Sequence, residues 1–387
     1  MKKISFISGS RAEYSLMKPI MLQASQSQII EQTNIFTGTH FSEKYGLSKK
    51  NILDDLLSID YEVDLAIATD NRQDIADYVS KGIKGFANFF SSYRPDLICI
   101  LGDRYEILSA AICATVFGIP IAHIHGGEVT QGAIDDAIRH SITKMAHLHF
   151  VSTNSHWKRV IQLGESPSKV FNVGAIGIDN IRKLKILKRN QLKQVLGIKN
   201  LDNFFVVTFH PATLEHGKNE SAMKEILLGI STYPEKSIIF TMPNADTESN
   251  KITNLIKEFC KKNINAHFYK NLGQQNYLSC LALADCVIGN SSSGIIEAPS
   301  LKTPTVNVGN RQKGRERAKS IIDCSPKSGE IINAINKAIA IKYDDNLKVY
   351  SNPYDNGGAI TKILEILEKV KIDNLLDKEF YDVHFKP

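Results

Sequence analysis

Short apolar runs that end in a polar or glycine-rich turn, and then lead into a helical stretch, recur along the whole 387-residue sequence. The runs show no alternation of apolar and polar residues, so both faces of each expected strand must be buried. Strands of this kind are typical of a parallel sheet with helices on both of its faces. We expect such strands at residues 3–8, 96–101, 120–124, 148–152, 204–208, 237–241, 285–289 and 304–308.

The pattern is interrupted by a lysine-rich stretch, residues 181–200, and then starts again. Two such series in a chain of this length predict two domains. We therefore expect an α/β protein of two Rossmann-like domains whose parallel sheets face a central cleft. The first domain is expected at residues 1–173 and the second at 174–358. A pair of glycines breaks the chain before a last helix, within 359–387, which we expect to complete the first domain.

The composition limits the classes of partner. A formal net charge of +6, with scattered Lys and Arg, fits an enzyme that attracts an anionic small molecule, whereas nucleic-acid-binding proteins more often carry a concentrated basic face. None of the six cysteines forms a C-x-x-C pair, and no spacing of His and Cys suits a metal, so we expect no metal site. No secretory signal opens the sequence. We expect a cytoplasmic enzyme with reduced thiols and neither a membrane nor a nucleic-acid partner.

The polar turns fall where the expected strands end, which is where open parallel sheets bind their ligands. Residues 289–294, GNSSSG, lie between a strand and a helix expected at 295–301. Backbone N–H groups, the helix dipole and serine hydroxyls favour a phosphate there, and Glu297 is placed to accept hydrogen bonds from a ribose. The alternative is that a serine only caps the helix. Arg11 and Arg311 each follow a strand and are candidate diphosphate partners, because the guanidinium fork matches phosphate oxygens.

Candidate acid–base residues also follow expected strands. Asp103 closes one strand and Asp135 precedes a helix, and both equally fit the role of a helix cap. Asp135 also fits an ion pair with Arg139, one turn later. His125 follows another strand. His210 ends the first strand of the second half, where a histidine suits hydrogen bonding to a phosphate or proton transfer.

Taken in order along the chain, a set of short strings resembles the hydrolysing UDP-N-acetylglucosamine 2-epimerases of bacterial sialic acid biosynthesis, and their relatives in legionaminic acid biosynthesis. Each string is weak by itself, whereas the ordered set is specific. The strings are GSRAEY at residues 9–14, GTH at 38–40, GDR at 102–104, DDAIRHS at 135–141, HP at 210–211, PNAD at 243–246, GNSSSG at 289–294 and GNRQ at 309–312.

The resemblance implies a glycosyltransferase-B-like fold, and hydrolysis of UDP-N-acetylglucosamine to N-acetylmannosamine and UDP. In such enzymes UDP is eliminated to leave a 2-acetamidoglucal, to which water adds with the opposite configuration at C2. No metal or nicotinamide cofactor is implied, and a homodimer or tetramer is expected. Carried over by position, Asp103 and Asp135 are acid–base candidates, His210 lies near the diphosphate, and Arg104 and Arg139 support them. The implied UDP-binding residues are Arg11, Asn244, Ser291, Ser292, Glu297 and Arg311.

The chain departs from the family pattern at one turn. Many members carry a catalytic glutamate in an H-x-E-G-G string, whereas this chain reads HIHGGE at residues 123–128. His125 stands at the glutamate position, and Glu128 follows three residues later. Either side chain is a candidate for the third acid–base group, and we favour Glu128 as the carboxylate.

Four other functions fit parts of the pattern. The same mechanism on UDP-2,4-diacetamido-2,4,6-trideoxyglucose would serve legionaminic acid synthesis. A non-hydrolysing epimerase usually reads H-x-E-A-G at the third strand, which the two glycines after His125 disfavour. A glycosyltransferase on the same fold would need an acceptor and release no glycal. A nucleotide-sugar sensor would bind UDP without turnover, which the presence of both Asp103 and Asp135 disfavours.

Overall fold

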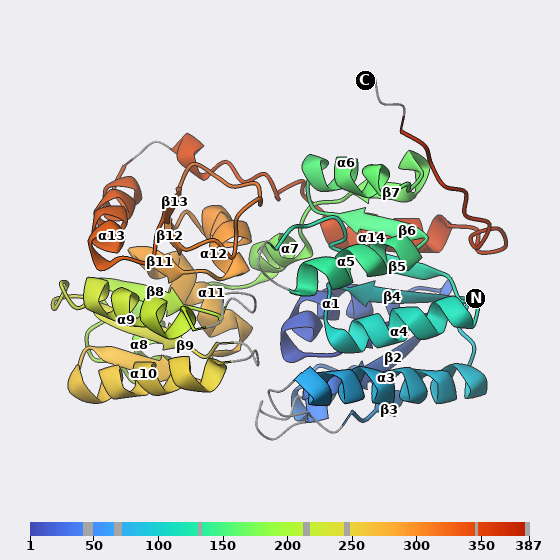
Figure 1. Ribbon diagram of the computed structural model, residues 1–387, viewed down its shortest axis with the longest axis horizontal. Coiled ribbons are helices and arrows are strands. Elements are labelled where there is room, and N and C mark those ends of the chain that lie inside the picture. Colours follow the sequence, from blue (N-terminus) through green and yellow to red (C-terminus); the bar gives the residue numbers. More distant parts are fainter. Residues whose placement is uncertain are drawn as a thin grey trace. The chain divides into compact units, whose positions relative to one another are not determined.

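The computed structural model shows two compact units, each built around one parallel sheet (Figure 1). The first unit comprises Met1–Glu128, Asp135–Asp179 and Asn356–Pro387, and the second comprises Val129–Ile134 and Asn180–Asp355. The residues that the structure describes are 1–41, 49–65, 72–130, 134–211, 217–243, 248–344 and 347–383.

The units change over at residues 179 and 355, whereas the sequence suggested 173 and 358. The Asp179 carboxylate accepts hydrogen bonds from the backbone N–H groups of Gly358 (3.1 Å) and Ile360 (2.9 Å). These groups open helix α14 (Ala359–Lys369), and the first N–H groups of a helix have no partner within it. Asp179 therefore stays with the unit that contains α14. Nothing in the sequence predicted that residues 129–134 belong to the second unit.

The first unit contains a seven-stranded sheet in the order β3-β2-β1-β4-β5-β6-β7, and each strand is parallel to its neighbours. Its strands are β1 (Lys2–Ser8), β2 (Ile30–Thr37), β3 (Tyr61–Val63), β4 (Leu97–Leu101), β5 (Ile121–Ile124), β6 (Leu148–Val151) and β7 (Val170–Asn172). Its helices, besides α14, are α1 (Arg11–Ala24), η1 (Gly38–Phe41), α2 (Lys49–Asp54), α3 (Arg72–Ser92), α4 (Tyr105–Val116), α5 (Ile134–Met145), α6 (Asn154–Gln162) and η3 (Pro167–Lys169), followed by α7 (Ile176–Lys183) at the boundary.

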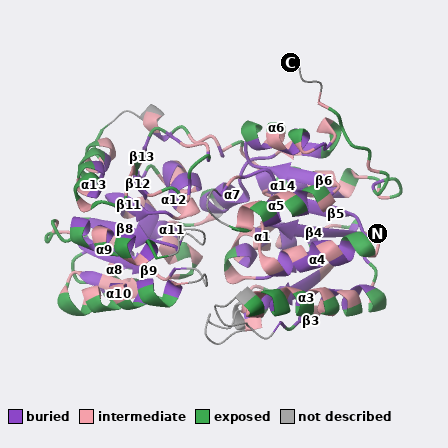
Figure 2. Ribbon diagram, viewed as in Figure 1, coloured by how far each residue is buried: buried purple, intermediate pink, exposed green. Residues whose placement is uncertain are grey.

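Strand β4 shows why the apolar runs lack alternation. Leu97, Cys99 and Leu101 join a core with α1 and α14, while Ile98 and Ile100 join a core with α3, α4 and α5. Both faces of the strand are therefore covered, as in other parallel sheets. The central strands are buried, and the helices carry exposed residues on their outer faces (Figure 2).

The second unit contains a six-stranded parallel sheet in the order β10-β9-β8-β11-β12-β13. Phe205 and Val207 of β8 face the core with α9, α10 and α13, while Phe204 and Val206 face the core with α8 and α11. The strands are β8 (Phe204–Thr208), β9 (Ser237–Thr241), β10 (Ala266–Tyr269), β11 (Cys286–Gly289), β12 (Thr305–Val308) and β13 (Ile321–Cys324). The helices are α8 (Arg189–Leu196), α9 (Asn219–Ile230), α10 (Ser249–Lys262), α11 (Gly273–Leu283), α12 (Ser292–Ile296), η4 (Ala298–Leu301), α13 (Ser328–Lys342) and η5 (Leu347–Tyr350).

The expected strands are all present, and the sequence missed β2, β3, β7, β10 and β13. The last four of these are the edge strands of the two sheets. Each has a partly exposed face, so it does not form the continuous apolar run that marks a central strand. Strand β2 lies next to an edge. Its first residue, Ile30, is followed by the polar sequence Glu31-Gln32-Thr33, so the strand shows no continuous apolar run although its second half is buried.

The longest described helix, α3, carries charged residues between Arg72 and Lys84. Within the described ranges, no helix combines the length and the apolar character needed to cross a membrane.

Glu165 is a buried carboxylate at the centre of a charge cluster in the first unit. Its carboxylate contacts His149 Nε2 (2.9 Å), Lys144 Nζ (2.9 Å) and Lys378 Nζ (2.8 Å). Burial by itself raises the pKa of Glu165, but the hydrogen bonds from these three partners outweigh it and lower the pKa to about 2. Lys378 also donates to the carbonyl oxygens of Lys144 and Ala146, so the cluster fixes the C-terminal segment to the end of α5.

Replacing Glu165 by Gln is expected to lower the free energy of unfolding by about 3 kcal/mol at pH 7, because the remaining charges lose their buried partner. The folded-state pKa lies below the unfolded one, so this contribution is present above about pH 4.5 and is lost as the pH falls toward 2. Urea unfolding should therefore show a gap between wild type and variant that is about 1 kcal/mol smaller at pH 4 than at pH 7. Glu220→Gln, in an exposed pair with Lys224, is the control, and an equal loss in both variants would contradict the assignment.

Candidate active site

The strand order reverses once in each sheet, between β1 and β4 in the first and between β8 and β11 in the second. At such a switch point the two connections leave toward opposite faces of the sheet, so the carboxyl ends of the strands open a crevice in which α/β proteins bind ligands. The turns after β1 and β4 carry Arg11, Asp103 and Arg104, and the turns after β8 and β11 carry His210 and Ser291. Five of the thirteen predicted site residues therefore lie at one of the two switch points.

Arg11 is the first residue of α1 and lies on a tightly held turn. The side chain of Ser10 caps α1 by accepting the Glu13 N–H, and the Gly9 N–H donates to the Glu13 carboxylate at 2.7 Å. Burial, together with the neighbouring carboxylate of Glu106, raises the pKa of Glu13 to about 8. Glu13 is therefore mostly protonated at neutral pH. These contacts fix the backbone from which the half-buried Arg11 projects.

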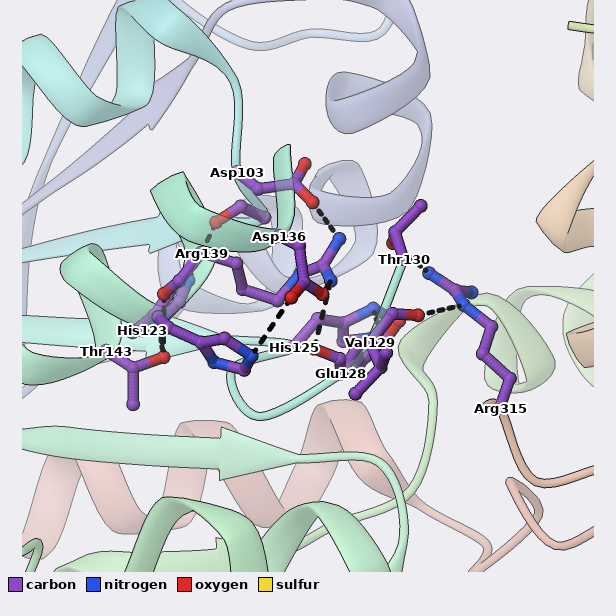
Figure 3. A network of polar contacts seen from close by, with 12 residues as sticks. Asp103, His123, His125, Glu128, Val129, Thr130, Asp136, Arg139, Thr143 and Arg315 are labelled. Atoms are coloured by element: carbon purple, nitrogen blue, oxygen red, sulfur yellow. Dashed lines mark hydrogen bonds and ion pairs between the residues drawn. The ribbon is translucent and has the colours of Figure 1, made fainter. Parts of the chain in front are cut away.

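Asp103 does not cap the helix that follows it. Helix α4 has Arg104 as its N-cap residue, with no hydrogen bond from a side chain. The Asp103 carboxylate instead forms an ion pair with the guanidinium of Arg139, on α5 (Figure 3). The Arg104 Nε lies 3.7 Å from a carboxylate oxygen of Glu106. The capping interpretation of Asp103 is thus wrong, because its carboxylate is turned toward α5.

His125 and Glu128 are in contact with each other. His125 has a left-handed backbone, with φ of 65°, at the turn that follows β5. Its Nδ1 lies 3.3 Å from Oε1 of the buried Glu128. The same oxygen accepts a hydrogen bond from the Ser152 hydroxyl at 2.9 Å, and that hydroxyl is 3.0 Å from His156 Nδ1. The two candidates for the third acid–base group, His125 and Glu128, therefore contact each other and belong to the same part of the site.

Arg139 connects this pair to Asp103. One guanidinium nitrogen of Arg139 contacts Asp103, and the other donates to the backbone carbonyl of Glu128 at 3.0 Å (Figure 3). The second nitrogen also lies 3.9 Å from Asp136. Asp135 is half-buried in the first turn of the same helix. The structure thus joins Asp103, Arg139, Glu128 and His125 at the carboxyl ends of β4 and β5.

His123, on β5, connects the backbone before Asp103 to helix α5. Its Nε2 lies 2.8 Å from the carbonyl oxygen of Gly102, directly before Asp103, and its Nδ1 lies 3.2 Å from the Thr143 hydroxyl. That hydroxyl donates to the Arg139 carbonyl at 2.9 Å. Burial lowers the pKa of His123 to about 3, so the ring is neutral at physiological pH. A neutral buried histidine here holds β4 and α5 in register and does not titrate with the reaction.

In the second unit, Asn290 is a residue whose role sequence reasoning missed. Its side-chain oxygen accepts the backbone N–H of His210 at 2.7 Å, and its side-chain nitrogen donates to the His210 carbonyl at 2.8 Å. Its own carbonyl accepts from Arg311 (3.2 Å) and from Gln312 (2.8 Å). Asn290 therefore ties together the turns after β8, β11 and β12. The sequence feature that could have indicated this role is the position of Asn290 directly after Gly289, the glycine that ends β11.

The serine-rich turn follows a glycine that no other residue could replace. Gly289 has φ of 134°, and a Cβ there would lie 1.9 Å from the carbonyl oxygen of Thr208. Ser291 caps α12, and Ser292 is its first residue. The helix expected at residues 295–301 is in fact two short pieces, α12 and η4. Pro299 lies at the start of η4, and because proline lacks an N–H it cannot extend α12.

His210 and Arg311 both contact Asn290. Burial, and secondarily the charge of Arg311, lowers the pKa of His210 to about 3, so His210 is neutral. Glu297 is the C-cap residue of α12, and burial raises its pKa, partly offset by a hydrogen bond from Ser293. Asn244 lies outside the described residues. Arg311, His210 and Ser291 are therefore brought together around Asn290.

Among the described residues, no group of three or more His, Cys, Asp or Glu side chains has an arrangement that could hold a metal ion.

The two parallel sheets and their switch-point residues define an α/β protein of two Rossmann-like domains, of the glycosyltransferase-B-like class. The family model described as UDP-N-acetylglucosamine 2-epimerase matches residues 23–368, and the chain belongs to this family.

Several relatives extend over the whole chain. The GDP/UDP-N,N'-diacetylbacillosamine 2-epimerase (hydrolyzing) of Campylobacter jejuni is 38% identical, covering 99% of each chain. The polysialic acid biosynthesis protein P7 of Escherichia coli is 39% identical, covering 99% of this chain and 98% of that one. The UDP-N,N'-diacetylbacillosamine 2-epimerase (hydrolyzing) of Legionella pneumophila is 32% identical, covering 96% of this chain and 97% of its own.

Solved structures of the family share the fold. UDP-GlcNAc 2-epimerase of Methanocaldococcus jannaschii, in complex with UDP-GlcNAc and UDP, has a TM-score of 0.80 at 22% identity, over 94% of this chain and 99% of that one. The Neisseria meningitidis enzyme bound to UDP-GlcNAc has a TM-score of 0.79 at 18% identity, over 96% of this chain and 100% of that one.

Proposed function

We propose that the protein is a hydrolysing 2-epimerase that converts UDP-N-acetylglucosamine to N-acetylmannosamine and UDP, for sialic acid synthesis. The observation that carries the proposal is the contact network of Asp103, Arg139, Glu128 and His125 at the carboxyl ends of β4 and β5. Relatives that are hydrolysing 2-epimerases support the reaction type. The relative from polysialic acid biosynthesis supports this sugar.

The reaction needs two proton transfers at C2 and a stabilised leaving group. A base removes the C2 proton, the electron pair of that bond forms the C1–C2 double bond, and the bond from C1 to the UDP oxygen breaks. Water then adds its hydroxyl at C1, while an acid returns a proton to the other face of C2. General acid–base groups contribute about 10²–10⁴-fold each. Asp103, Asp135 and the His125–Glu128 pair are the proposed groups, with Arg139 holding Asp103 and Glu128 in place.

The leaving diphosphate is proposed to bind the second unit, with Arg11 as a further partner. Arg311 keeps its charge and offers a planar fork of donors to the phosphate oxygens. Neutral His210 can donate a hydrogen bond to the same group. Fixed donors at a developing anion stabilise the transition state without reorganising. The full proposed set is Arg11, His210, Asn244, Ser291, Ser292, Glu297 and Arg311.

Turnover of UDP-N-acetylglucosamine in D₂O tests the proposal. We expect free UDP and N-acetylmannosamine that carries deuterium at C2, identified by NMR. Product without deuterium at C2 would contradict the elimination mechanism. Intact UDP-N-acetylmannosamine would indicate a non-hydrolysing epimerase instead.

A second candidate substrate is UDP-2,4-diacetamido-2,4,6-trideoxyglucose. Two of the relatives are 2-epimerases of diacetylbacillosamine nucleotides, which carry this sugar. The reaction at C2 would be unchanged, and only the groups at C4 and C6 differ. The ratio of kcat/KM for the two nucleotide sugars, measured side by side, decides between them.

The His125–Glu128 contact makes a sharp prediction for the third acid–base group. If Glu128 is that group, Glu128→Gln should lower kcat by about 10²-fold or more, while His125→Ala should lower it less. The hydrogen bond from Ser152 to Glu128 does not involve the histidine, so the carboxylate stays in place in His125→Ala. Steady-state UDP release measures both variants. A larger loss of kcat in His125→Ala than in Glu128→Gln would assign the acid–base role to His125. Wild-type kcat in both variants would exclude both residues from that role.

A further inference from the structure

Residues 129–134 are part of the second unit, although the chain on either side of them is part of the first. The segment is flanked by Glu128 on one side and by Asp135 on the other. Both flanking residues are proposed acid–base groups. The backbone that carries Glu128 therefore continues directly into Val129 and Thr130, which belong to the second unit.

Arg315 holds Val129 and Thr130, the first two residues of this segment. Its Nε donates to the Val129 carbonyl at 3.0 Å, and a terminal guanidinium nitrogen lies 3.3 Å from the Thr130 hydroxyl (Figure 3). The Arg315 side chain and Thr130 are both buried. One planar guanidinium therefore fixes two consecutive residues directly after Glu128, which a single point contact could not do.

Arg315 is itself fixed to the proposed UDP site. Its backbone N–H donates to the Gln312 carbonyl at 3.3 Å, and the Gln312 side chain donates to the Asn290 carbonyl at 2.8 Å. Arg317 donates to the carbonyls of both Arg315 and Gln312. A continuous set of hydrogen bonds thus runs from Asn290, at the serine-rich turn, through Gln312 to Arg315 and on to Val129.

We propose that Arg315 is a positioning residue for the reaction, which anchors Val129 and Thr130 to the turn that carries Gln312 and thereby positions the adjoining Glu128. The expected effect of Arg315 on kcat rests on the proposed function, whereas the anchoring of Val129 and Thr130 by Arg315 does not. Misplacing a catalytic group by about 1 Å can cost about 10²-fold in rate. The guanidinium of Arg315 contacts Val129 and Thr130, which are not among the proposed nucleotide-binding residues, so we expect its loss to spare nucleotide affinity.

Arg315→Ala is expected to lower kcat by about 10–100-fold, while KM and the Kd for UDP change by less than about threefold. Arg315→Lys, which keeps the charge and can give one hydrogen bond in place of two, should recover part of kcat. Thr130→Val should lower kcat by a smaller factor, and the double variant Arg315→Ala/Thr130→Val should be no slower than Arg315→Ala alone. Lys224→Ala, on the exposed face of α9, is the matched control and should keep the kcat of wild type.

Hydrogen–deuterium exchange provides a readout that does not need turnover. Peptides that contain Val129 and Thr130 should exchange faster in Arg315→Ala than in wild type, and peptides of the central strands should not. Faster exchange in a protein that turns over neither sugar would leave the anchoring intact and reject the proposed function. Unchanged exchange, or a loss of UDP affinity equal to the loss of kcat, would overturn the role of Arg315. Faster exchange throughout the second unit would also overturn the positioning role of Arg315, because it would indicate a purely structural role.

Discussion

Asp103→Asn is expected to reduce kcat by about 10²–10⁴-fold, because the amide keeps the size of the carboxylate but cannot accept or return a proton. The amide also cannot form the ion pair with Arg139 that holds this side chain. The Kd for UDP should stay near that of wild type, since the proposed diphosphate partners lie mainly in the second unit. Single-turnover UDP release, together with calorimetric UDP binding, separates the two effects.

Asp96→Asn is the matched control for this prediction. Asp96 precedes β4, at the opposite end of the strand from Asp103, and its carboxylate accepts the Lys3 N–H at 2.8 Å. The same chemical change there should leave kcat unaltered. If Asp103→Asn kept more than about a tenth of the wild-type kcat, the residue would not be one of the acid–base groups.

Asn290→Ala is expected to weaken UDP binding by about tenfold or more and to destabilise the second unit. The change removes the two hydrogen bonds that the Asn290 amide makes to the backbone N–H and carbonyl of the buried His210. An unsatisfied buried polar group costs about 1–3 kcal/mol, so we expect a loss of about 2–4 kcal/mol in the free energy of unfolding. The turn that positions His210 would then no longer be fixed to the serine-rich turn. Urea unfolding and calorimetric titration with UDP measure the two losses.

Asn265→Ala tests whether this effect depends on position. Asn265 also makes two hydrogen bonds to backbone, to the carbonyls of Lys236 (2.7 Å) and Pro234 (3.3 Å). It precedes β10, at the amino end of a parallel strand and away from the proposed UDP site. We expect a smaller loss of stability and an unchanged Kd for UDP. Equal losses of UDP affinity in both variants would mean that Asn290 acts only through stability.

The central strands were predictable, and the edge strands were not. A run such as Leu97–Leu101 is apolar on both faces because helices cover both sides of the sheet. In β13 only the first residue is buried, because the strand has a neighbour on one side alone. A pattern that depends on burial of both faces therefore cannot find it.

The candidate site was predictable as a set of residues but not as a set of contacts. The turns after the strands contain Asp103, Glu128 and His210, and the string at residues 135–141 contains Arg139. The sequence could not distinguish a capping Asp103 from an ion-paired one, because both meanings fit the same string. It also treated His125 and Glu128 as alternatives, whereas the left-handed backbone of His125 brings the two side chains into contact.

The sequence by itself determined the two-domain α/β class and the turns that carry the chemistry, because helix and strand periodicity and glycine-rich strand ends are local properties of the chain. Only the tertiary structure decided which partners those turns have. Arg139 meets Asp103, Asn290 meets His210, and Arg315 meets Val129 across separations of 36, 80 and 186 residues. Such pairs depend on which strands become neighbours in a sheet, and on which unit the short segment after Glu128 joins. Neither is encoded in the spacing of residues along the chain.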